Sequence, residues 1–253
     1  MTIKTAVLNG VATIEIARPE KKNAITAAMY LAMAEALDAA MADAAVRAVL
    51  IAGQPGIFSS GNDLEDFMRH RGKFEESPGF VFMRALLGCD KPVVAAVTGA
   101  AIGIGTTLLL HCDFVYVSDE ARLALPFVSL GLVPEFASSL VVPQLMGNVR
   151  AAEKLLLGDP FTAAEAVECG IANAVLPAGE LMGHARRIAE RFNALPPGAV
   201  QECKRLLRRA RSAAVLETIG VEGEQFTRRL RSPEAMEAFT AFFEKRMPDF
   251  SKF

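Results

Sequence analysis

The segment Val97-Thr-Gly-Ala-Ala-Ile-Gly-Ile-Gly-Thr-Thr-Leu108 leaves an apolar strand pattern and opens a helical one. Its glycine-rich turn places unpaired backbone N–H groups at a helix start, where the helix dipole also favours negative charge. An earlier segment, Ile51-Ala-Gly-Gln-Pro-Gly-Ile-Phe-Ser-Ser-Gly-Asn-Asp-Leu64, has the same form. Either segment alone is also typical of close helix-to-strand packing. The two together indicate a backbone oxyanion site in an α/β chain.

Strand and helix patterns alternate through the first half of the chain. Asn9-Gly10 separates two apolar runs, residues 4–8 and 11–17, and so predicts an opening β-hairpin. Thr26 is the expected N-cap of an alanine-rich helix that runs to about residue 45. Further strands are predicted at residues 46–52, 93–97 and 114–117. This alternation predicts an α/β fold.

The second half of the sequence is predominantly helical in pattern. Helices are predicted at residues 151–157, 163–169, 180–192, 197–210, 213–231 and 233–245. We divide the chain into a core at residues 1–195 and a helical C-terminal region at residues 196–253. The basic cluster between Lys204 and Arg211 is interpreted as a solvated helix face.

Composition excludes several classes of protein. The 253 residues are 52% hydrophobic with a formal net charge of -2, which indicates a globular chain without the basic field of a nucleic-acid or anionic-membrane binder. Residues 92–110 carry no charge, yet Pro92 and several glycines interrupt them, so a membrane helix is not expected.

The cysteines and the termini bear on the compartment. The four cysteines form no Cys-x-x-Cys pair, which favours a reducing compartment and gives no zinc motif. The N-terminus has no secretory pattern, so a cytoplasmic location is expected. The alternative is a peroxisomal one, because Ser251-Lys252-Phe253 is similar to the Ser-Lys-Leu address.

The quoted segments resemble the crotonase, or enoyl-CoA hydratase/isomerase, superfamily over nearly the whole chain. Arg18-Pro-Glu-Lys-Lys-Asn-Ala-Ile25 resembles the family's early coenzyme A contact, and 58–64 and 97–104 resemble its two oxyanion segments. Residues 161–171 and 232–239 resemble later landmarks. The resemblance implies a spiral of ββα units with a helical region that builds a homotrimer or a dimer of trimers.

Site residues follow from this resemblance by position. The thioester oxygen is expected between the backbone N–H groups of Asn62 and Ile104. Coenzyme A contacts are expected at Lys22, Ala24, Ser60, Gly61, Asp63 and Leu64, with Asp63 also interpreted as a loop brace. An acyl-CoA thioester is the implied substrate. No separate cofactor and no metal are expected, since coenzyme A is part of that substrate.

Departures from the family pattern narrow the reaction. Thr107 and Phe127 stand where the hydratases carry two glutamates, whereas Glu135 matches the single catalytic glutamate of the peroxisomal-type 3-enoyl-CoA to 2-enoyl-CoA isomerases. The resemblance therefore implies an isomerase in which Glu135 moves one proton from the α-carbon to the γ-carbon. An apolar surround, suggested by Phe127, Val128, Leu132 and Phe136, is expected to raise its pKa.

Alternatives remain open at this point. Pro134-Glu135 is also typical of the first turn of a helix, where an acid only stabilises the dipole. Other activities on the same scaffold are isomerisation of a ring-bearing acyl-CoA of phenylacetate-type degradation, hydration of an enoyl-CoA, and binding of coenzyme A or RNA without turnover. Acyl preference depends on residues 67–82, which we interpret as a helix or lid.

Overall fold

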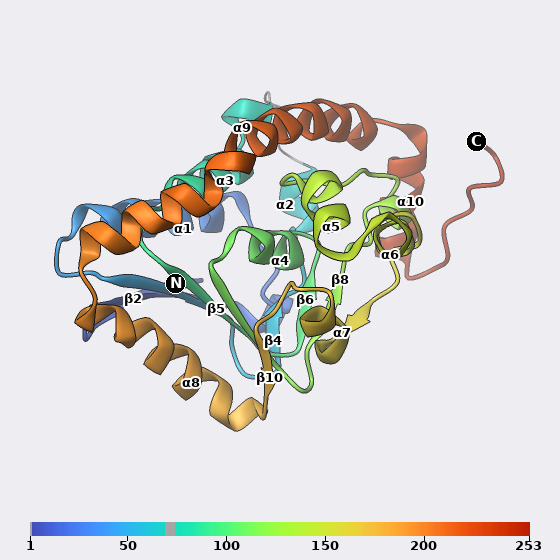
Figure 1. The fold of residues 1–253 in the computed structure, drawn as a ribbon. Coiled ribbons are helices and arrows are strands. Elements are labelled where there is room, and N and C mark those ends of the chain that lie inside the picture. Colours follow the sequence, from blue (N-terminus) through green and yellow to red (C-terminus); the bar gives the residue numbers. More distant parts are fainter. Residues whose placement is uncertain (1, 69–73) are drawn as a thin grey trace.

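The computed structural model describes residues 2–68 and 74–253. The predicted segments at residues 67–82 are therefore described only in part, because residues 69–73 lie outside this range. Figure 1 shows two β-sheets near the centre of the molecule, with helices on both sides of the larger one and the long helix α9 along one edge. Among the described helices, none is long and apolar enough to span a membrane.

The larger sheet has the order β1-β2-β3-β5-β7-β10 and is parallel apart from the opening hairpin. Its strands are β1 (Ile3–Leu8), β2 (Val11–Ile16), β3 (Ala48–Ala52), β5 (Val93–Val97), β7 (Phe114–Ser118) and β10 (Ala174–Leu176). The hairpin at Asn9-Gly10 and the three predicted inner strands are confirmed. Every residue of β3 and β5 is buried, as expected for parallel strands covered on both faces.

A smaller sheet has the order β4-β6-β8-β9. Its strands are β4 (Ile57–Ser59), β6 (Ala100–Ile102), β8 (Arg122–Ala124) and β9 (Phe161–Thr162). Three times in succession the chain leaves a strand of the larger sheet and enters a strand of the smaller one. Gly99 permits one such bend, because it has a φ of +61° and a Cβ there would lie 1.9 Å from the Gly56 oxygen. This repetition is the predicted spiral of ββα units.

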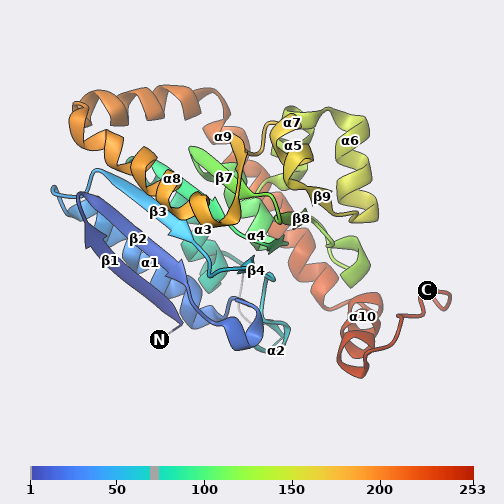
Figure 2. The ribbon, with the colours of Figure 1, turned by 90° about the horizontal axis from the view of Figure 1, so that it is seen from below.

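Helices cover both faces of the larger sheet. Helix α8 (Ala178–Glu190) packs on β2, β3, β5 and β7, and α1 (Ala27–Ala42) packs on β1 and β2. The other described helices are α2 (Leu64–Phe67), α3 (Pro78–Gly88), α4 (Ile104–Thr107), α5 (Ser138–Met146), α6 (Asn148–Ala152), α7 (Ala163–Glu168), α9 (Pro197–Leu230) and α10 (Pro233–Glu244). Short turns are η1 (Pro19–Lys21), η2 (Phe74–Glu76), η3 (Leu108–His111), η4 (Val128–Leu130), the π-helical η5 (Glu153–Leu157) and η6 (Arg191–Ala194). Thr26 caps α1 as predicted, accepting from the Met29 amide. Figure 2 shows α10 far from β1, at the other side of the spiral.

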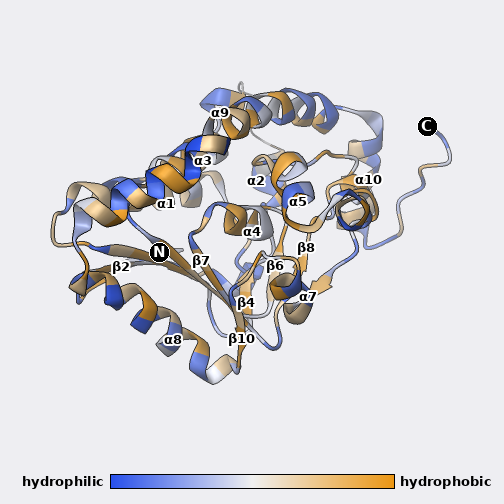
Figure 3. Ribbon diagram, in the orientation of Figure 1, coloured by the Kyte–Doolittle hydropathy of each residue, from blue (hydrophilic) through white to orange (hydrophobic). Residues whose placement is uncertain are grey.

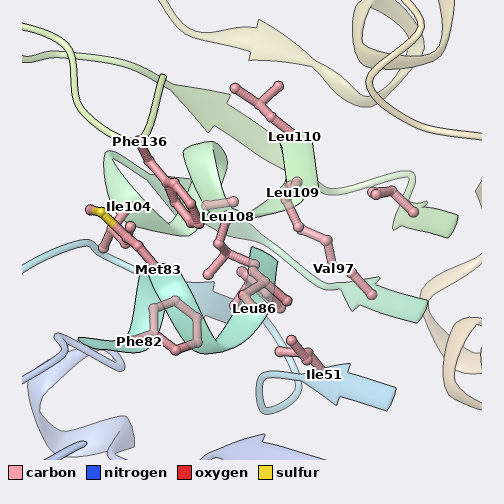
Figure 4. Packing of buried hydrophobic residues seen from close by; sticks show 14 of the residues in the cluster. Ile51, Phe82, Met83, Leu86, Val97, Ile104, Leu108, Leu109, Leu110 and Phe136 are labelled. Carbon is pink, nitrogen blue, oxygen red and sulfur yellow. The ribbon is translucent and has the colours of Figure 1, made fainter. Parts of the chain in front are cut away.

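The main core lies between the sheets and the helices α1, α3, α4 and α5. Figure 4 shows Phe136 and Ile104 packed with Met83 and Leu108, where the strands end and the helices begin. A second core lies under α8, between Leu181 of that helix and Leu50 of β3. In Figure 3 most strand segments are orange, while blue segments recur along α8 and α9, as expected for helices with one solvent face.

Two predictions about the C-terminal region were wrong. The helices predicted at 197–210 and 213–231 form one continuous α9, because the intervening Arg211-Ser212 contains no proline or glycine to end the helix. The basic cluster is not wholly solvated: Lys204 is buried and lies 2.6 Å from Asp113, and Arg208 bonds the same carboxylate at 3.0 Å. The Asp113 carboxylate, whose side chain is 20% exposed, draws these two cations inward. The division of the chain at residue 195 stays a prediction.

Candidate active site

The described chain contains two neighbouring cavities that share Asn62, Glu135 and Phe226 in their linings. The large cavity measures about 610 Å³ and the small cavity about 100 Å³. Nine predicted site residues all line the large cavity: Lys22, Ala24, Ser60, Gly61, Asn62, Asp63, Leu64, Ile104 and Glu135. The structure thus brings together residues that lie up to 113 positions apart in sequence. Their roles stay predictions.

The backbone around Asn62 leaves its amide free of the local strand pairing. Asn62 forms an isolated parallel bridge with Ile25, in which the Ile25 amide donates to the Gly61 oxygen at 2.8 Å and the Asp63 amide to the Ile25 oxygen at 2.9 Å. This alternation uses the amides on either side of Asn62 and not its own. Within the described residues, the Asn62 amide donates to no protein acceptor.

Ile104 is the first residue of α4, so its amide has no partner within the helix. The preceding Gly103 has φ 56° and ψ -118°, a conformation open only to glycine, which turns the chain from β6 into the helix. Among described residues, the Ile104 amide also has no backbone acceptor. Asn62 and Ile104 line the same cavity, and two unpaired amides there are what an oxyanion hole needs.

The loop after β4 is held by side chains from the segment before α1. Arg18 Nη1 donates to the Asp63 carboxylate at 2.7 Å and to the Ala24 oxygen at 3.0 Å. Burial alone would raise the pKa of Asp63, but bonds from the Asp66 amide and from Arg18 hold it below its usual range. Asp63 also caps α2 through that Asp66 amide at 3.0 Å. Asp63 is thus a brace, as its loop position predicted.

The coenzyme A candidates lie on the same braced unit. The Ser60 amide donates to the Lys22 oxygen at 3.1 Å, which joins the two segments directly. Asn23 is fully buried, and its side-chain amide donates to the Ile57 and Phe58 oxygens at 3.2 and 3.1 Å. This buried asparagine orders Lys22 and Ala24 at the wall of the large cavity.

Glu135 does not lie in the first turn of a helix, so that interpretation of Pro134-Glu135 was wrong. Helix α5 begins three residues later at Ser138, and Phe136 and Ala137 both adopt left-handed backbone, with φ of 57° and 55°. Each such residue costs roughly 1 to 2 kcal/mol relative to ordinary backbone. The chain accepts this strain in the turn that directs Glu135 into the cavities.

Glu135 is a buried carboxyl group with an unpaired oxygen. Its side chain is 6% exposed, and among the described residues Oε1 has no hydrogen-bond partner. Burial first, and then the charge of Glu222, raise its pKa from the ordinary 4.5 to about 8. Of the apolar surround that we predicted, Phe127, Leu132 and Phe136 are buried. The prediction was wrong for Val128, which is 43% exposed. A carboxyl group in this state suits general acid and base catalysis near neutral pH.

Sequence reasoning missed two residues that hold the site. The Tyr30 hydroxyl, on α1, donates to the Asn62 side-chain oxygen at 2.5 Å, and so holds the loop that follows β4 against α1. Burial, followed by the charge of Glu135, raises the Tyr30 pKa well above its ordinary value. The second residue, Glu222, contacts the turn after Glu135. It had a sequence signal, because an acidic residue at position 222 interrupts the apolar helix stripe of Val215, Ile219 and Phe226.

The small cavity has a mostly apolar wall beyond Glu135. It is lined from α1 by Tyr30, from α3 by Phe80 and Met83, and from α9 by Leu230. Phe74 adds a ring that lies against the bare backbone of Gly223, where a Cβ would come within 2.2 Å of the ring. This arrangement suits an apolar chain that extends past the carboxyl group.

The two positions that distinguish the hydratases carry no carboxylate near the cavity. Thr107 is buried in α4, and its hydroxyl has no partner among the described residues. Phe127 is buried and forms part of the large-cavity wall. Neither side chain is a carboxylic acid or base at ordinary pH.

The chain is similar in sequence and fold to known enoyl-CoA hydratases and isomerases. A family model described as enoyl-CoA hydratase/isomerase matches residues 7–252. The chain is 35% identical to enoyl-CoA delta isomerase 2 of Rattus norvegicus, over 94% of this chain and 62% of that protein. It is 29% identical to a probable enoyl-CoA hydratase of Bacillus subtilis, with 98% of each covered. The solved structure of OdaA from Pseudomonas aeruginosa shares 50% identity and a TM-score of 0.93, over 95% and 98% of the two chains.

These relatives differ in their named reactions and in their length. The chain spans less than two thirds of the rat isomerase, so that protein contains further sequence without a counterpart here. Isomerase and hydratase relatives occur at similar identities. The choice between the two reactions therefore depends on the site itself.

Proposed function

The chain belongs to the enoyl-CoA hydratase/isomerase family, in the crotonase superfamily, and we propose that it moves the double bond of a 3-enoyl-CoA to give trans-2-enoyl-CoA. One observation carries the proposal. In the described part of the chain, Glu135 is the single acidic residue that lines both cavities, and one of its oxygens is unpaired. A transposition needs one group that takes a proton and returns it two carbons away.

The proposed reaction uses the backbone and one side chain. Ionised Glu135 takes the α-proton of the 3-enoyl thioester, and the C–H electron pair moves into a dienolate. The amides of Asn62 and Ile104 stabilise the negative thioester oxygen, each by about 3 to 4 kcal/mol in the transition state. Protonated Glu135 then delivers the same proton to the γ-carbon, which leaves the conjugated product and regenerates the base.

Neither of the two positions where the resemblance places the hydratase glutamates carries a carboxylate, which favours isomerisation over hydration. Addition of water by the family's usual pair would place acids at residues 107 and 127, where the chain carries Thr107 and Phe127. A raised pKa also supports a carboxyl group that alternates between acid and base, since both forms are populated near pH 8. Coenzyme A enters the proposal as part of the substrate, with its nucleotide portion at Lys22, Ala24 and Ser60.

A trimer or dimer of trimers is part of the same proposal, as is a cytoplasmic location. Exposed leucines on α9, among them Leu206, Leu207 and Leu216, support association between copies. Light scattering after size exclusion would measure the assembly directly. A monomer at micromolar concentration would contradict this part of the proposal.

The test is conversion of a trans-3-enoyl-CoA to its conjugated isomer, followed by absorbance, with wild type and Glu135→Gln compared. We expect the variant to lose about a thousandfold in kcat, consistent with general-base catalysis, while affinity for a saturated acyl-CoA stays within about threefold. Glu120→Gln, an exposed acid that lines neither cavity, is the matched control. Equal rates in Glu135→Gln would refute the proposed base.

The same preparations should be assayed for hydration of a 2-enoyl-CoA. Hydration that exceeds isomerisation in the wild type would replace the proposal with a hydratase. Turnover only of a ring-bearing thioester would move it to the aromatic substrates. Binding without any turnover would indicate a binding protein.

A further inference from the structure

Helix α9 places an acid in the molecular interior beside the candidate base. Glu222 is 6% exposed and lies on the buried face of α9, between Ile219 and Phe226. A carboxylate at such a position is costly unless it is hydrogen-bonded. Its partners therefore indicate why the helix carries it.

The Glu222 carboxylate accepts three hydrogen bonds from the start of α5. Oε2 accepts from the Ala137 amide at 2.6 Å, and Oε1 accepts from the Ser139 amide at 2.9 Å and the Ser139 hydroxyl at 2.5 Å. Helices normally obtain such a cap from a serine, threonine or aspartate just before their first residue. Ala137 has no side-chain oxygen, so Glu222 supplies the cap from 85 residues away.

The bonds from Glu222 act on the strained part of the chain. Phe136 and Ala137 hold left-handed backbone directly after Glu135, and such strain persists only where surrounding contacts enforce it. His111 donates from Nε2 to the Phe136 oxygen at 2.7 Å, and its ring stacks on that phenylalanine at 4.0 Å. His111 thus secures one side of the turn and Glu222 the other.

We propose that Glu222 is a positioning residue for Glu135. The Glu222 carboxylate fixes the turn at residues 136–139, and so sets the direction of the Glu135 side chain and places a negative charge beside it. The proposal rests on the isomerase mechanism, in which Glu135 must reach two carbons of one substrate. It assigns a role in that mechanism to α9, which contributes no proposed catalytic group.

Electrostatics support the geometric argument. Tyr30, Asp66 and Arg231 line the small cavity with Glu135, and His111 and Glu222 bond the turn that follows it. The charged residues that line the large cavity with Glu135 are Glu20, Lys21, Lys22, Asp63 and Glu65. Tyr30 stays neutral because its pKa is raised, and His111 stays neutral because burial lowers its pKa to about 3. Glu222 supplies the charge that adds to burial in raising the Glu135 pKa.

Three donors favour the ionised form of Glu222. Burial raises the pKa of Glu222 above its ordinary value, and the bonds from Ser139 and the Ala137 amide offset only part of that rise. A proton on Oε2 would compete with the Ala137 amide for the same position. The negative charge and the cap therefore depend on each other.

Two variants separate reach from charge. Glu222→Gln keeps the length of the side chain but removes the charge. Its side-chain NH₂ group cannot accept a hydrogen bond, so at least one of the donors on Ala137 and Ser139 loses its acceptor. Glu222→Asp keeps the charge but shortens the reach. Glu224→Gln, on the exposed side of the same helix, removes a charge without touching the turn and is the matched control.

For each variant we would measure kcat and KM for isomerisation from pH 5.5 to 9.5. Glu222→Gln should move the midpoint of the kcat profile down by about one pH unit, because a negative neighbour is lost. Glu222→Asp should leave the midpoint in place and lower kcat roughly tenfold or more, since small misplacements of a base are costly. KM should stay within about threefold, because coenzyme A is held by other segments. Glu224→Gln should match the wild type.

A readout independent of turnover keeps this inference separate from the proposed reaction. Titration of ¹³C-labelled glutamate carboxyls by NMR, with Glu135→Gln used for assignment, should show the Glu135 midpoint lowered in Glu222→Gln. If that shift occurs but Glu135→Gln stays active, the proposed function fails and the coupling of the two acids stands. If Glu135→Gln is inactive, yet both Glu222 variants keep the wild-type midpoint and kcat, the positioning role is refuted.

Loss of folding in the Glu222 variants would still leave a test. Ser139→Ala removes only the hydroxyl bond of 2.5 Å and keeps both amide bonds. It should lower kcat about threefold, with the thermal midpoint and KM close to wild type, because one of three restraints is gone. An unchanged kcat in Ser139→Ala would count against the proposal.

Discussion

Replacing Glu135 with glutamine should stabilise the protein, and the gain should grow as pH rises. Burial and the neighbouring Glu222 raise the Glu135 pKa from 4.5 to about 8. Between these values the folded chain keeps a proton that the unfolded chain has lost, so the free energy of unfolding falls as pH rises through that window. The gap between Glu135→Gln and wild type should widen by roughly 3 to 4 kcal/mol from pH 5 to 8.5.

Urea unfolding followed by circular dichroism at pH 5, 7 and 8.5 would measure this gap. In thermal melts the same difference corresponds to roughly 6 to 16 °C for a chain of this size. Glu120→Gln, the exposed control, should show a gap that does not change with pH. A constant difference between Glu135→Gln and wild type at all three pH values would refute a buried, proton-retaining carboxyl group.

Three further outcomes follow from single contacts. Tyr30→Phe removes the bond to Asn62 and should lower kcat/KM roughly tenfold while the thermal midpoint changes little, as measured with a trans-3-enoyl-CoA. Gly223→Ala places a methyl group against Phe74 and should reduce turnover of long acyl chains more than of short ones in a chain-length series. Asp113→Ala removes the carboxylate that Lys204 and Arg208 of α9 share, and should lower the free energy of unfolding by roughly 3 kcal/mol in urea. An unchanged urea midpoint would show that these two ion pairs do not stabilise the fold.

Much of the larger sheet could be predicted because its strands have strong local signals. Asn9-Gly10 requires left-handed backbone that asparagine and glycine tolerate, and β3 and β5 are uninterrupted apolar runs. The smaller sheet could not be predicted, since β4, β6 and β8 are only three residues long and show no periodicity. These short strands nevertheless place both candidate oxyanion residues, because Asn62 follows the end of β4 by three residues and Ile104 follows the end of β6 by two.

The backbone part of the candidate site was easier to predict from the sequence than its buried carboxyl group. The two glycine-rich segments indicated exposed backbone N–H groups, and the resemblance to the crotonase superfamily then assigned the amides of Asn62 and Ile104. Glu135 was locally ambiguous because Pro134 before it is typical of a helix start. Contacts from distant residues decide the outcome, and no local pattern encodes a bond that spans 85 positions.

Local conflicts in this chain are concentrated around one carboxyl group. Phe136 and Ala137 oppose their own backbone preferences, Glu135 is buried without a full set of partners, and Glu222 interrupts an apolar stripe. Each conflict alone is destabilising, and natural chains tolerate such conflicts mainly at functional sites. Relief of the conflict at position 135 by glutamine should therefore raise stability while it abolishes turnover. The long α9 can bear this cost because it is anchored along its length by Val215 and Ile219 in the main core.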